Sequence, residues 1–200
     1  MAKPLVIVFA RAPRYGAVKT RLARDIGAAD TLRFYRTALR DLIRRIGHDP
    51  RWETRLCVTP DVAAAERNLW PLAATAQGHG DLGRRMARAL RAAGSRPAVV
   101  VGSDIPALGA RHVATAFQAL RRGPFALGPA NDGGYWLIGA RCGAALAPNA
   151  LDGVRWSSPQ TLADSAARLH NVQILDATLD DVDDGAGYRA VGTRQSCLAL

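Results

Sequence analysis

The chain has 200 residues, of which 48% are hydrophobic and 22% charged, and its formal net charge is +10. This length fits one domain of ordinary size, and the composition is that of a globular protein rather than a disordered chain. No apolar run approaches the ~20 residues of a membrane span, and no charged-then-apolar leader opens the sequence. We therefore expect one cytoplasmic domain over residues 1–200.

The positive charge comes almost entirely from arginine and favours anionic partners such as nucleotides, phosphorylated substrates, nucleic acid or a membrane surface. The arginines are scattered through predicted helices, as on a solvated helix face, rather than gathered in a tail. With four Tyr and four Phe, the chain lacks the basic–aromatic interleaving of single-strand binders. The composition therefore does not favour a nucleic-acid partner.

Strand and helix patterns alternate along the chain. Short apolar runs predict strands over residues 4–10, 54–58, 73–76, 98–101, 125–128, 135–139 and 172–175. Helical spacing of apolar residues predicts helices from about 17, from an N-cap at Asp30 to 46, over 61–69, over 110–122, over 158–169 and at the C-terminal end. A further helix follows the glycine-rich segment that begins at Gln77, and this helix reaches about residue 93. The turn Asn131–Gly134 joins two of the strands as a hairpin. The pattern predicts a three-layer α/β/α fold with a mostly parallel central sheet and one hairpin.

A basic loop, Arg11–Leu22, follows the first predicted strand. Gly16 permits a tight backbone, the following helix supplies free N–H groups, and Lys19 and Arg21 supply positive charge, a combination that suits a phosphate. The loop has neither the spacing of a Walker loop nor that of a dinucleotide-binding G-x-G-x-x-G. The alternative interpretation is a solvated basic helix start.

The segment Gln77–Met86 is rich in glycine and precedes a helix. Gly78, Gly80 and Gly83 allow close approach of another backbone or of a flat ligand, and Asp81 can cap the helix. The segment is either a structural turn or a contact to a base or substrate.

Asp104 follows a buried strand that ends in Gly102-Ser103. Open α/β sheets bind their ligands at the carboxyl ends of their strands, although an acid there can also cap a turn. A nucleoside diphosphate or triphosphate usually brings Mg²⁺, which takes hard oxygen ligands. Asp104 would then need a second acid, and the candidates are Asp132, Asp181 and Asp183.

In these segments the chain resembles the GT-A-like nucleotide-diphospho-sugar transferase superfamily, with a Rossmann-like nucleotide-binding half. More narrowly it resembles the radical-SAM/selenodomain-associated, or arsenosugar-type, glycosyltransferases. It is also similar to the molybdopterin and 2-phospholactate nucleotidyltransferases. The segments that carry the resemblance are F-A-R-A-P-R-Y-G-A-V-K-T-R-L (Phe9–Leu22), Q-G-H-G-D-L-G-R-R-M (Gln77–Met86), G-S-D-I-P-A-L (Gly102–Leu108), G-P-A-N-D-G-G-Y-W-L-I-G (Gly128–Gly139) and W-S-S-P-Q-T-L (Trp156–Leu162).

The resemblance implies a metal-dependent transferase with Lys19, Arg21 and Asp104 as catalytic residues, and with Mg²⁺ or Mn²⁺ held by Asp104 and Asp183. Related transferases supply the second ligand from a D-x-D-T-P-E-D-L-like segment, whereas here Asp184-Gly185-Ala186-Gly187 replaces its T-P-E-D part. The implied nucleotide-binding residues are Ala10, Arg11, Pro13, Gly16, Lys19, Arg21, Gln77, Gly78, Gly80, Asp81 and Ser103. The implied acceptor-binding residues are Asn131, Asp132, Gly133, Gly134, Tyr135 and Trp156.

Three functions fit these features. The first is glycosyl transfer from a nucleotide-sugar donor to a small-molecule acceptor. The second is nucleotidyl transfer, in which the same residues hold a nucleoside triphosphate while a phosphorylated or hydroxyl acceptor attacks the α-phosphorus. The third is a domain that binds a nucleotide or an anionic polymer without turnover.

Overall fold

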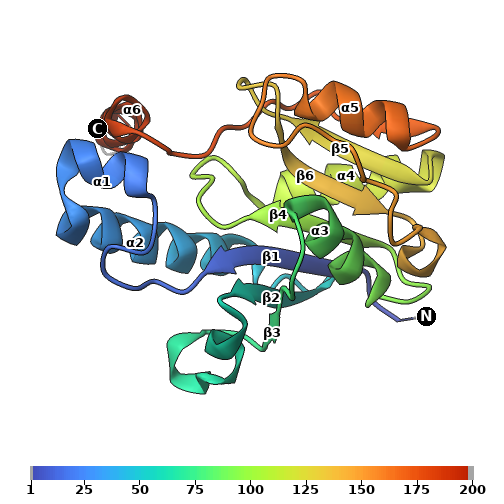
Figure 1. Cartoon of the computed structure of the whole chain (residues 1–200), viewed down its shortest axis with the longest axis horizontal. Coiled ribbons are helices and arrows are strands. Elements are labelled where there is room, and N and C mark those ends of the chain that lie inside the picture. Colours follow the sequence, from blue (N-terminus) through green and yellow to red (C-terminus); the bar gives the residue numbers. More distant parts are fainter. Residues whose placement is uncertain (1, 198–200) are drawn as a thin grey trace.

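In the computed structural model, residues 2–197 are described, with side chains up to residue 191 (Figure 1). A seven-stranded sheet runs through the molecule in the order β3-β2-β1-β4-β6-β5-β7. The strands are β1 (Leu5–Arg11), β2 (Glu53–Thr59), β3 (Ala74–Ala76), β4 (Ala98–Gly102), β5 (Phe125–Pro129), β6 (Tyr135–Ala140) and β7 (Val172–Ile174). The helices are α1 (Thr20–Ile26), α2 (Ala28–Ile46), α3 (Leu82–Arg91), α4 (Ala110–Arg122), α5 (Thr161–Arg168) and α6 (Gly185–Cys197), with short 3₁₀ turns at Asp61–Ala65, Arg67–Leu69 and Gly143–Ala145.

The core lies on both faces of the sheet. Successive side chains of a strand point to opposite faces, so a central strand without polar residues buries both. In β1, Val6 and Val8 pack with the apolar residues of α2 and α4, whereas Leu5 and Ile7 pack with those of α3. This arrangement confirms the predicted α/β/α layers.

The carboxyl ends of six strands meet at one edge of the sheet. β1 pairs in parallel with β2 and β4, β2 with β3, and β5 with β7, while β6 runs antiparallel to β4 and β5. The predicted β5–β6 hairpin is therefore confirmed, and its turn lies at the same edge. Because the chain order reverses beside β1, the loops after β1 and β4 diverge there and leave a place for a ligand.

The first helix begins later than the sequence predicts. We expected a start at Ala17, but α1 begins at Thr20. Gly16 has φ 70° and Lys19 has φ 44°, so both lie in the left-handed region and neither continues a helix. Lys19 consequently lies outside the helix, at its N-cap.

Two other helix predictions were also wrong in detail. α2 begins at Ala28 with Gly27 as its N-cap, so Asp30 lies in the first turn and is not the cap. Residues 61–69 form two short 3₁₀ turns instead of one helix. The predicted helix cap at Asp81 is confirmed, because its Oδ1 accepts a hydrogen bond from the Arg84 backbone N–H at 2.8 Å.

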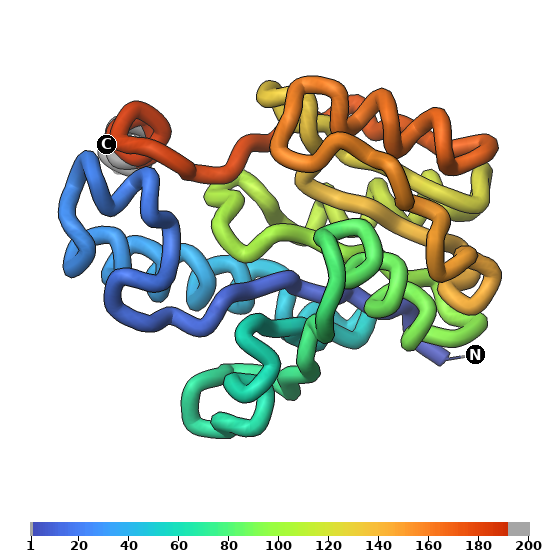
Figure 2. The backbone as a smooth tube through the Cα atoms, in the orientation of Figure 1, coloured from blue at the N-terminus to red at the C-terminus, as the bar shows by residue number. Residues whose placement is uncertain are grey.

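Residues 175–184 connect β7 to α6. Figure 2 shows this red-orange segment leaving the side of α5, crossing the carboxyl edge and reaching α6 beside α1. The Gly185 N–H donates to Asp25 Oδ2 at 2.7 Å, and the Gly187 N–H donates to Asp184 Oδ1 at 2.8 Å. The sequence Asp184-Gly185-Ala186-Gly187 departs from the family pattern, but it therefore still provides a capped start for α6. None of the helices in residues 2–197 has the length and apolar character needed to cross a bilayer.

Candidate functional site

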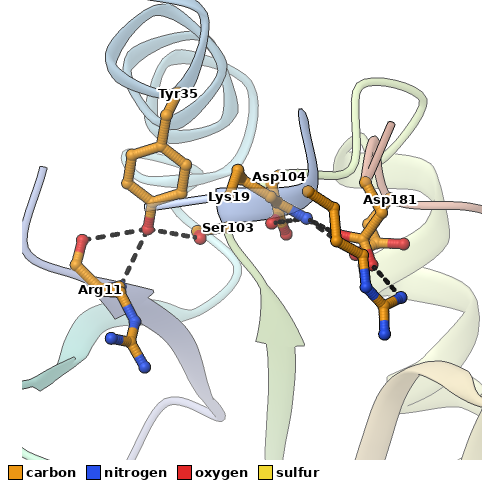
Figure 3. Close-up of polar contacts among 8 residues, drawn as sticks. Arg11, Lys19, Tyr35, Ser103, Asp104 and Asp181 are labelled. Carbon is orange, nitrogen blue, oxygen red and sulfur yellow. Dashed lines mark hydrogen bonds and ion pairs between the residues drawn. The ribbon is translucent and has the colours of Figure 1, made fainter. Parts of the chain in front are cut away.

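One lysine and three carboxylates converge at the carboxyl edge of the sheet (Figure 3). Lys19 Nζ lies 2.5 Å from Asp104 Oδ2, 2.9 Å from Asp181 Oδ2 and 2.5 Å from Asp183 Oδ1. Asp104 follows β4, Lys19 follows β1, and the other two acids come from the 175–184 segment. The structure thus brings together residues that are more than 160 positions apart.

Lys19 is the most buried member of this cluster. Its side chain is 10% exposed, against 16% for Asp104 and about half for the other two acids. Burial disfavours the charged ammonium, but the carboxylates of Asp104, Asp181 and Asp183 outweigh that effect and raise the lysine pKa above its ordinary value. Lys19 therefore carries a full positive charge across the physiological pH range.

The pKa values of the two acids in the 175–184 segment are shifted in opposite directions. Burial, together with the neighbouring carboxylates Asp104 and Asp183, raises the pKa of Asp181 despite the attraction of Lys19. Burial also opposes ionisation of Asp183, but Lys19 beside it more than compensates and lowers its pKa. The cluster is thus crowded with negative charge, which Lys19 offsets at its centre and the exposed Arg21 offsets beside Asp183.

Backbone and side-chain bonds fix the acidic segment in this position. The Val182 N–H donates to the Asp104 carbonyl at 3.3 Å. The backbone N–H and the side-chain amide of Asn131 donate to the two carboxylate oxygens of Asp180, at 2.9 and 2.6 Å. The β5–β6 turn and the loop after β4 therefore both hold the segment that supplies Asp181 and Asp183.

Tyr35 of α2 joins the loops after β1 and β4, and the sequence analysis missed it. The Arg11 N–H donates to the Tyr35 hydroxyl at 2.9 Å, the hydroxyl donates to the Arg11 carbonyl at 3.0 Å, and Ser103 Oγ lies 3.0 Å away. Burial raises the pKa of Tyr35, so it remains a neutral hydroxyl. The sequence signal was a hydroxyl-bearing residue within the apolar stripe of α2.

The predicted nucleotide-binding residues lie along the same edge, but several of them are fully engaged inside the protein. All polar groups of Gln77 are bonded: its side chain reaches the carbonyls of Ala10 and Cys57 and accepts from Arg85, and its backbone pairs with Val58 and Arg88. Gln77 thus fixes the turn after β3 instead of presenting free groups. Ala10, Pro13 and Ser103 are buried, whereas Arg11, Gly16, Gly80 and Asp81 are exposed.

The last two of these residues lie in the first turn of α1 and in the turn after β3. Arg21 is 76% exposed, and its guanidinium lies 4.0 Å from Asp183 Oδ2. Gly78 has φ 76°, and its N–H donates to Asp61 Oδ1 at 3.0 Å. Arg21 is therefore free to turn toward a ligand at the cluster, whereas Gly78 helps close the neighbouring turn.

A cavity of about 310 Å³ opens directly beside the carboxylate cluster. Asp104, Asp181 and Asp183 are among the residues that line it. Four of the predicted acceptor-binding residues also line it: Asp132, Gly134, Tyr135 and Trp156. The other two, Asn131 and Gly133, hold the turn in place.

The wall of this cavity depends on close packing between two loops. Leu162 N–H donates to the Gly133 carbonyl at 2.8 Å, and a Cβ at Gly133 would collide with the Pro159 backbone. Trp156 in turn packs against Gly83 of α3, where a Cβ would lie 2.5 Å from its ring. The structure thus joins the Asn131–Gly134 turn and the Trp156–Leu162 segment into one pocket.

The carboxylates of the cluster supply the type of ligand that Mg²⁺ and Mn²⁺ take. Oxygens of Asp104, Asp181 and Asp183 all reach one point, and hard divalent cations prefer carboxylate oxygen. That point is occupied by Lys19 Nζ, and the described residues contain no group of three His, Cys, Asp or Glu side chains already arranged as a metal site. The donor set therefore fits a divalent cation once the ammonium moves away.

Comparison with solved structures found similar chains. A "putative nucleotide-diphospho-sugar transferase" from Desulfovibrio desulfuricans G20 is 31% identical with a TM-score of 0.81, over 92% of this chain and 84% of that chain. The synthetase for CMP:2-keto-3-deoxy-manno-octonic acid in complex with CTP is 17% identical with a TM-score of 0.56, over 98% and 99%. Rv0371c from Mycobacterium tuberculosis H37Rv in complex with manganese is also 17% identical with a TM-score of 0.56, over 95% and 98%.

The two structures of 17% identity share the fold of this chain. The CTP and the manganese that they contain are properties of those proteins. A comparison with curated protein sequences found no match. Residues 42–158, more than half of the chain, match the family model described as "Uncharacterized protein conserved in bacteria (DUF2064)". The chain therefore belongs to the DUF2064 family and has the α/β fold of nucleotide-diphospho-sugar transferase-like structures.

Proposed function

We propose that this protein is a metal-dependent transferase that uses a nucleotide-sugar donor. One observation carries the proposal: Lys19 and three carboxylates converge where the loops after β1 and β4 diverge, and a cavity opens beside them. A transferase of this kind needs cationic charge for a diphosphate, oxygen ligands for a metal and space for an acceptor. The arsenosugar-type assignment within the superfamily stays a prediction.

Asp104, Asp181 and Asp183 would hold the metal. Bound there, Mg²⁺ or Mn²⁺ would neutralise charge on the donor diphosphate. Lys19 would leave the carboxylates and pair with the diphosphate, and Arg21 would join it from the exposed side of α1. Both side chains would stabilise the negative charge that builds on the leaving diphosphate.

The residues that line the cavity would position the acceptor, which would react through a hydroxyl group. Its hydroxyl oxygen would form a bond to the anomeric carbon of the sugar. The bond from that carbon to the diphosphate would break, and the nucleoside diphosphate would leave with the electron pair. Asp132, whose carboxylate lines the cavity, would take the hydroxyl proton and pass it to solvent.

Nucleotidyl transfer is the second candidate. The loop after β1 presents Lys19 and Arg21 beside the edge of the sheet, a position that also serves a triphosphate. A relative by fold was solved with CTP, and the fold therefore accommodates a nucleoside triphosphate in that protein. The released product separates the two reactions, because nucleotidyl transfer gives pyrophosphate and glycosyl transfer gives a nucleoside diphosphate.

The first test is binding. A thermal-shift screen of nucleoside diphosphates, triphosphates and nucleotide sugars with Mn²⁺ identifies the donor, because a bound ligand raises the unfolding temperature. Calorimetry with that donor should show no metal-dependent binding to Asp104→Ala, and weaker binding to Lys19→Ala and Arg21→Ala. Parent-like affinity of Asp104→Ala in the presence of Mn²⁺ would refute the proposal.

A further inference from the structure

We propose that the acceptor of this transferase is a hydroxyl compound that carries no anionic group and has an apolar face, such as the C–H face of a sugar ring or an aromatic ring. The inference rests on the proposed function and adds the class of acceptor to it. The observation behind it is the chemistry of the side chains that line the cavity.

One wall of the cavity is apolar and aromatic. Leu82 and Met86 of α3 lie on it, together with Phe9 at the end of β1. Tyr135 and Trp156 contribute rings whose centroids lie 6.4 Å apart in an edge-to-face arrangement. Rings held in this way present flat surfaces that suit a carbon-rich face of a ligand.

The charged side chains of the wall are all acidic. They are Asp104, Asp132, Asp181 and Asp183, and among the described residues no lysine, arginine or histidine lines the cavity. If three of these acids hold the metal, Asp132 still leaves a negative charge beside the acceptor. An acceptor phosphate or carboxylate would therefore lose its hydration without gaining a cationic partner.

The absence of cations on this wall contrasts with the rest of the molecule. The chain has a formal net charge of +10, yet α3 divides its residues between two surfaces. Leu82 and Met86 face the acceptor cavity, whereas Arg84, Arg88 and Arg91 line a separate cavity of about 460 Å³. The helical spacing of these residues places the arginines away from the acceptor.

Arg21, 4.0 Å from Asp183 Oδ2, is assigned to the donor diphosphate by the proposed function, and three other cations are engaged in contacts within the protein. Lys19 contacts the three carboxylates. Arg155, the neighbour of Trp156 in sequence, donates two hydrogen bonds to the Asp164 carboxylate, each of 2.8 Å. Arg85 of α3 donates to Gln77 at 2.7 Å. None of these three groups is therefore free to bind an acceptor anion.

The test uses three probes that differ in one group. They are phenyl β-glucoside, its 6-amino-6-deoxy derivative and its 6-phosphate. The full chain is first saturated with Mn²⁺ and with the nucleoside diphosphate that raises the unfolding temperature most. Each probe is then titrated, and binding is followed by tryptophan fluorescence, because Trp136 and Trp156 both line the cavity. We expect the neutral and amino probes to bind at least tenfold more tightly than the phosphate.

Two variants change the charge of the cavity without removing a hydrogen bond. Asp132→Asn keeps an oxygen that can accept from the Gly134 N–H, as Asp132 does at 2.8 Å, and should reduce the discrimination against the phosphate probe. Leu82→Lys places a cation at a residue that is 37% exposed and lines the cavity. This variant should increase the affinity for the phosphate probe at least fivefold and leave that for phenyl β-glucoside within a factor of three.

The outcomes separate this inference from the proposed function. If the parent binds the phosphate probe as tightly as phenyl β-glucoside, or binds none of the probes, the inference is wrong even though Mn²⁺ and the nucleotide bind. If Mn²⁺ and the nucleotide do not bind at all, the proposed function itself fails. Discrimination that Leu82→Lys leaves unchanged would also overturn the inference, because the charge of the wall would then not set the preference.

Discussion

Replacing Lys19 with Met removes the one cation on which three carboxylates converge. Lys19 and Asp104 are largely buried, and breaking a buried ion pair costs about 3–5 kcal/mol. Asp181 and Asp183 are about half exposed, so solvent screens them and each pair with the lysine contributes at most about 1 kcal/mol. Because the freed carboxylates can turn toward water, we expect a loss of about 3 kcal/mol.

The assay is thermal and urea unfolding of the parent and Lys19→Met, each with and without Mn²⁺ and without nucleotide. A loss of about 3 kcal/mol corresponds to a fall of roughly 6–12 °C in unfolding temperature for a chain of this size. Mn²⁺ should stabilise the variant more than the parent, since the carboxylates no longer need to release an ammonium. Lys3, the only other lysine of the chain, is exposed, and Lys3→Met is the matched control.

Two results would refute this reasoning. If Lys19→Met and Lys3→Met are equally stable, the carboxylates do not depend on Lys19. If Mn²⁺ raises the unfolding temperature of the parent and Lys19→Met by the same amount, the ammonium does not compete with the metal for these oxygens.

Three further predictions follow from the site and the cavity beside it. Lys19 lowers the pKa of Asp183 below its ordinary value of 3.8. The stability that the ionised carboxylate contributes is therefore present at neutral pH and is lost as the pH falls through the lowered pKa. Urea unfolding should show Asp183→Asn less stable than the parent at pH 7, with the difference shrinking below pH ~4. Tyr35→Phe should cost about 1–3 kcal/mol in urea unfolding, because it leaves the buried Ser103 hydroxyl and the partly buried backbone groups of Arg11 without their partner. Gly83→Ala should displace Trp156 and weaken binding of phenyl β-glucoside, while calorimetry shows unchanged affinity for Mn²⁺ and nucleotide.

Asp181→Asn is the matched control for the pH experiment. Burial and two neighbouring carboxylates raise the pKa of Asp181, so its ionised form costs stability above its ordinary pKa. The parent should therefore gain stability relative to Asp181→Asn as the pH falls, which is the opposite sign to Asp183→Asn. Equal pH profiles for the two variants would contradict the assignment of these shifts.

Local pattern determined much of the fold. A strand buried on both faces must be apolar, and the apolar runs over residues 5–10 and 98–101 show it directly. The basic loop, the acid after β4 and the Asn131–Gly134 turn each follow a strand. Since the carboxyl ends of parallel strands meet at one edge, these segments lie at the same edge of the sheet. The helix start at Thr20 was missed, because the left-handed backbone at Lys19 is unusual for a residue with a Cβ.

Only the tertiary structure decided which acids join Asp104. The sequence offered Asp132, Asp181 and Asp183 as candidates, among which the family resemblance favoured Asp183, and the path of residues 175–184 across the edge brings the last two to Asp104. That path depends on contacts between residues far apart in sequence, such as the bonds of Asn131 to Asp180. The absence of cations from the described cavity wall has the same origin, because it depends on which face of α3 the packed core turns toward the acceptor. Periodicity fixes the elements, but packing fixes which polar groups meet.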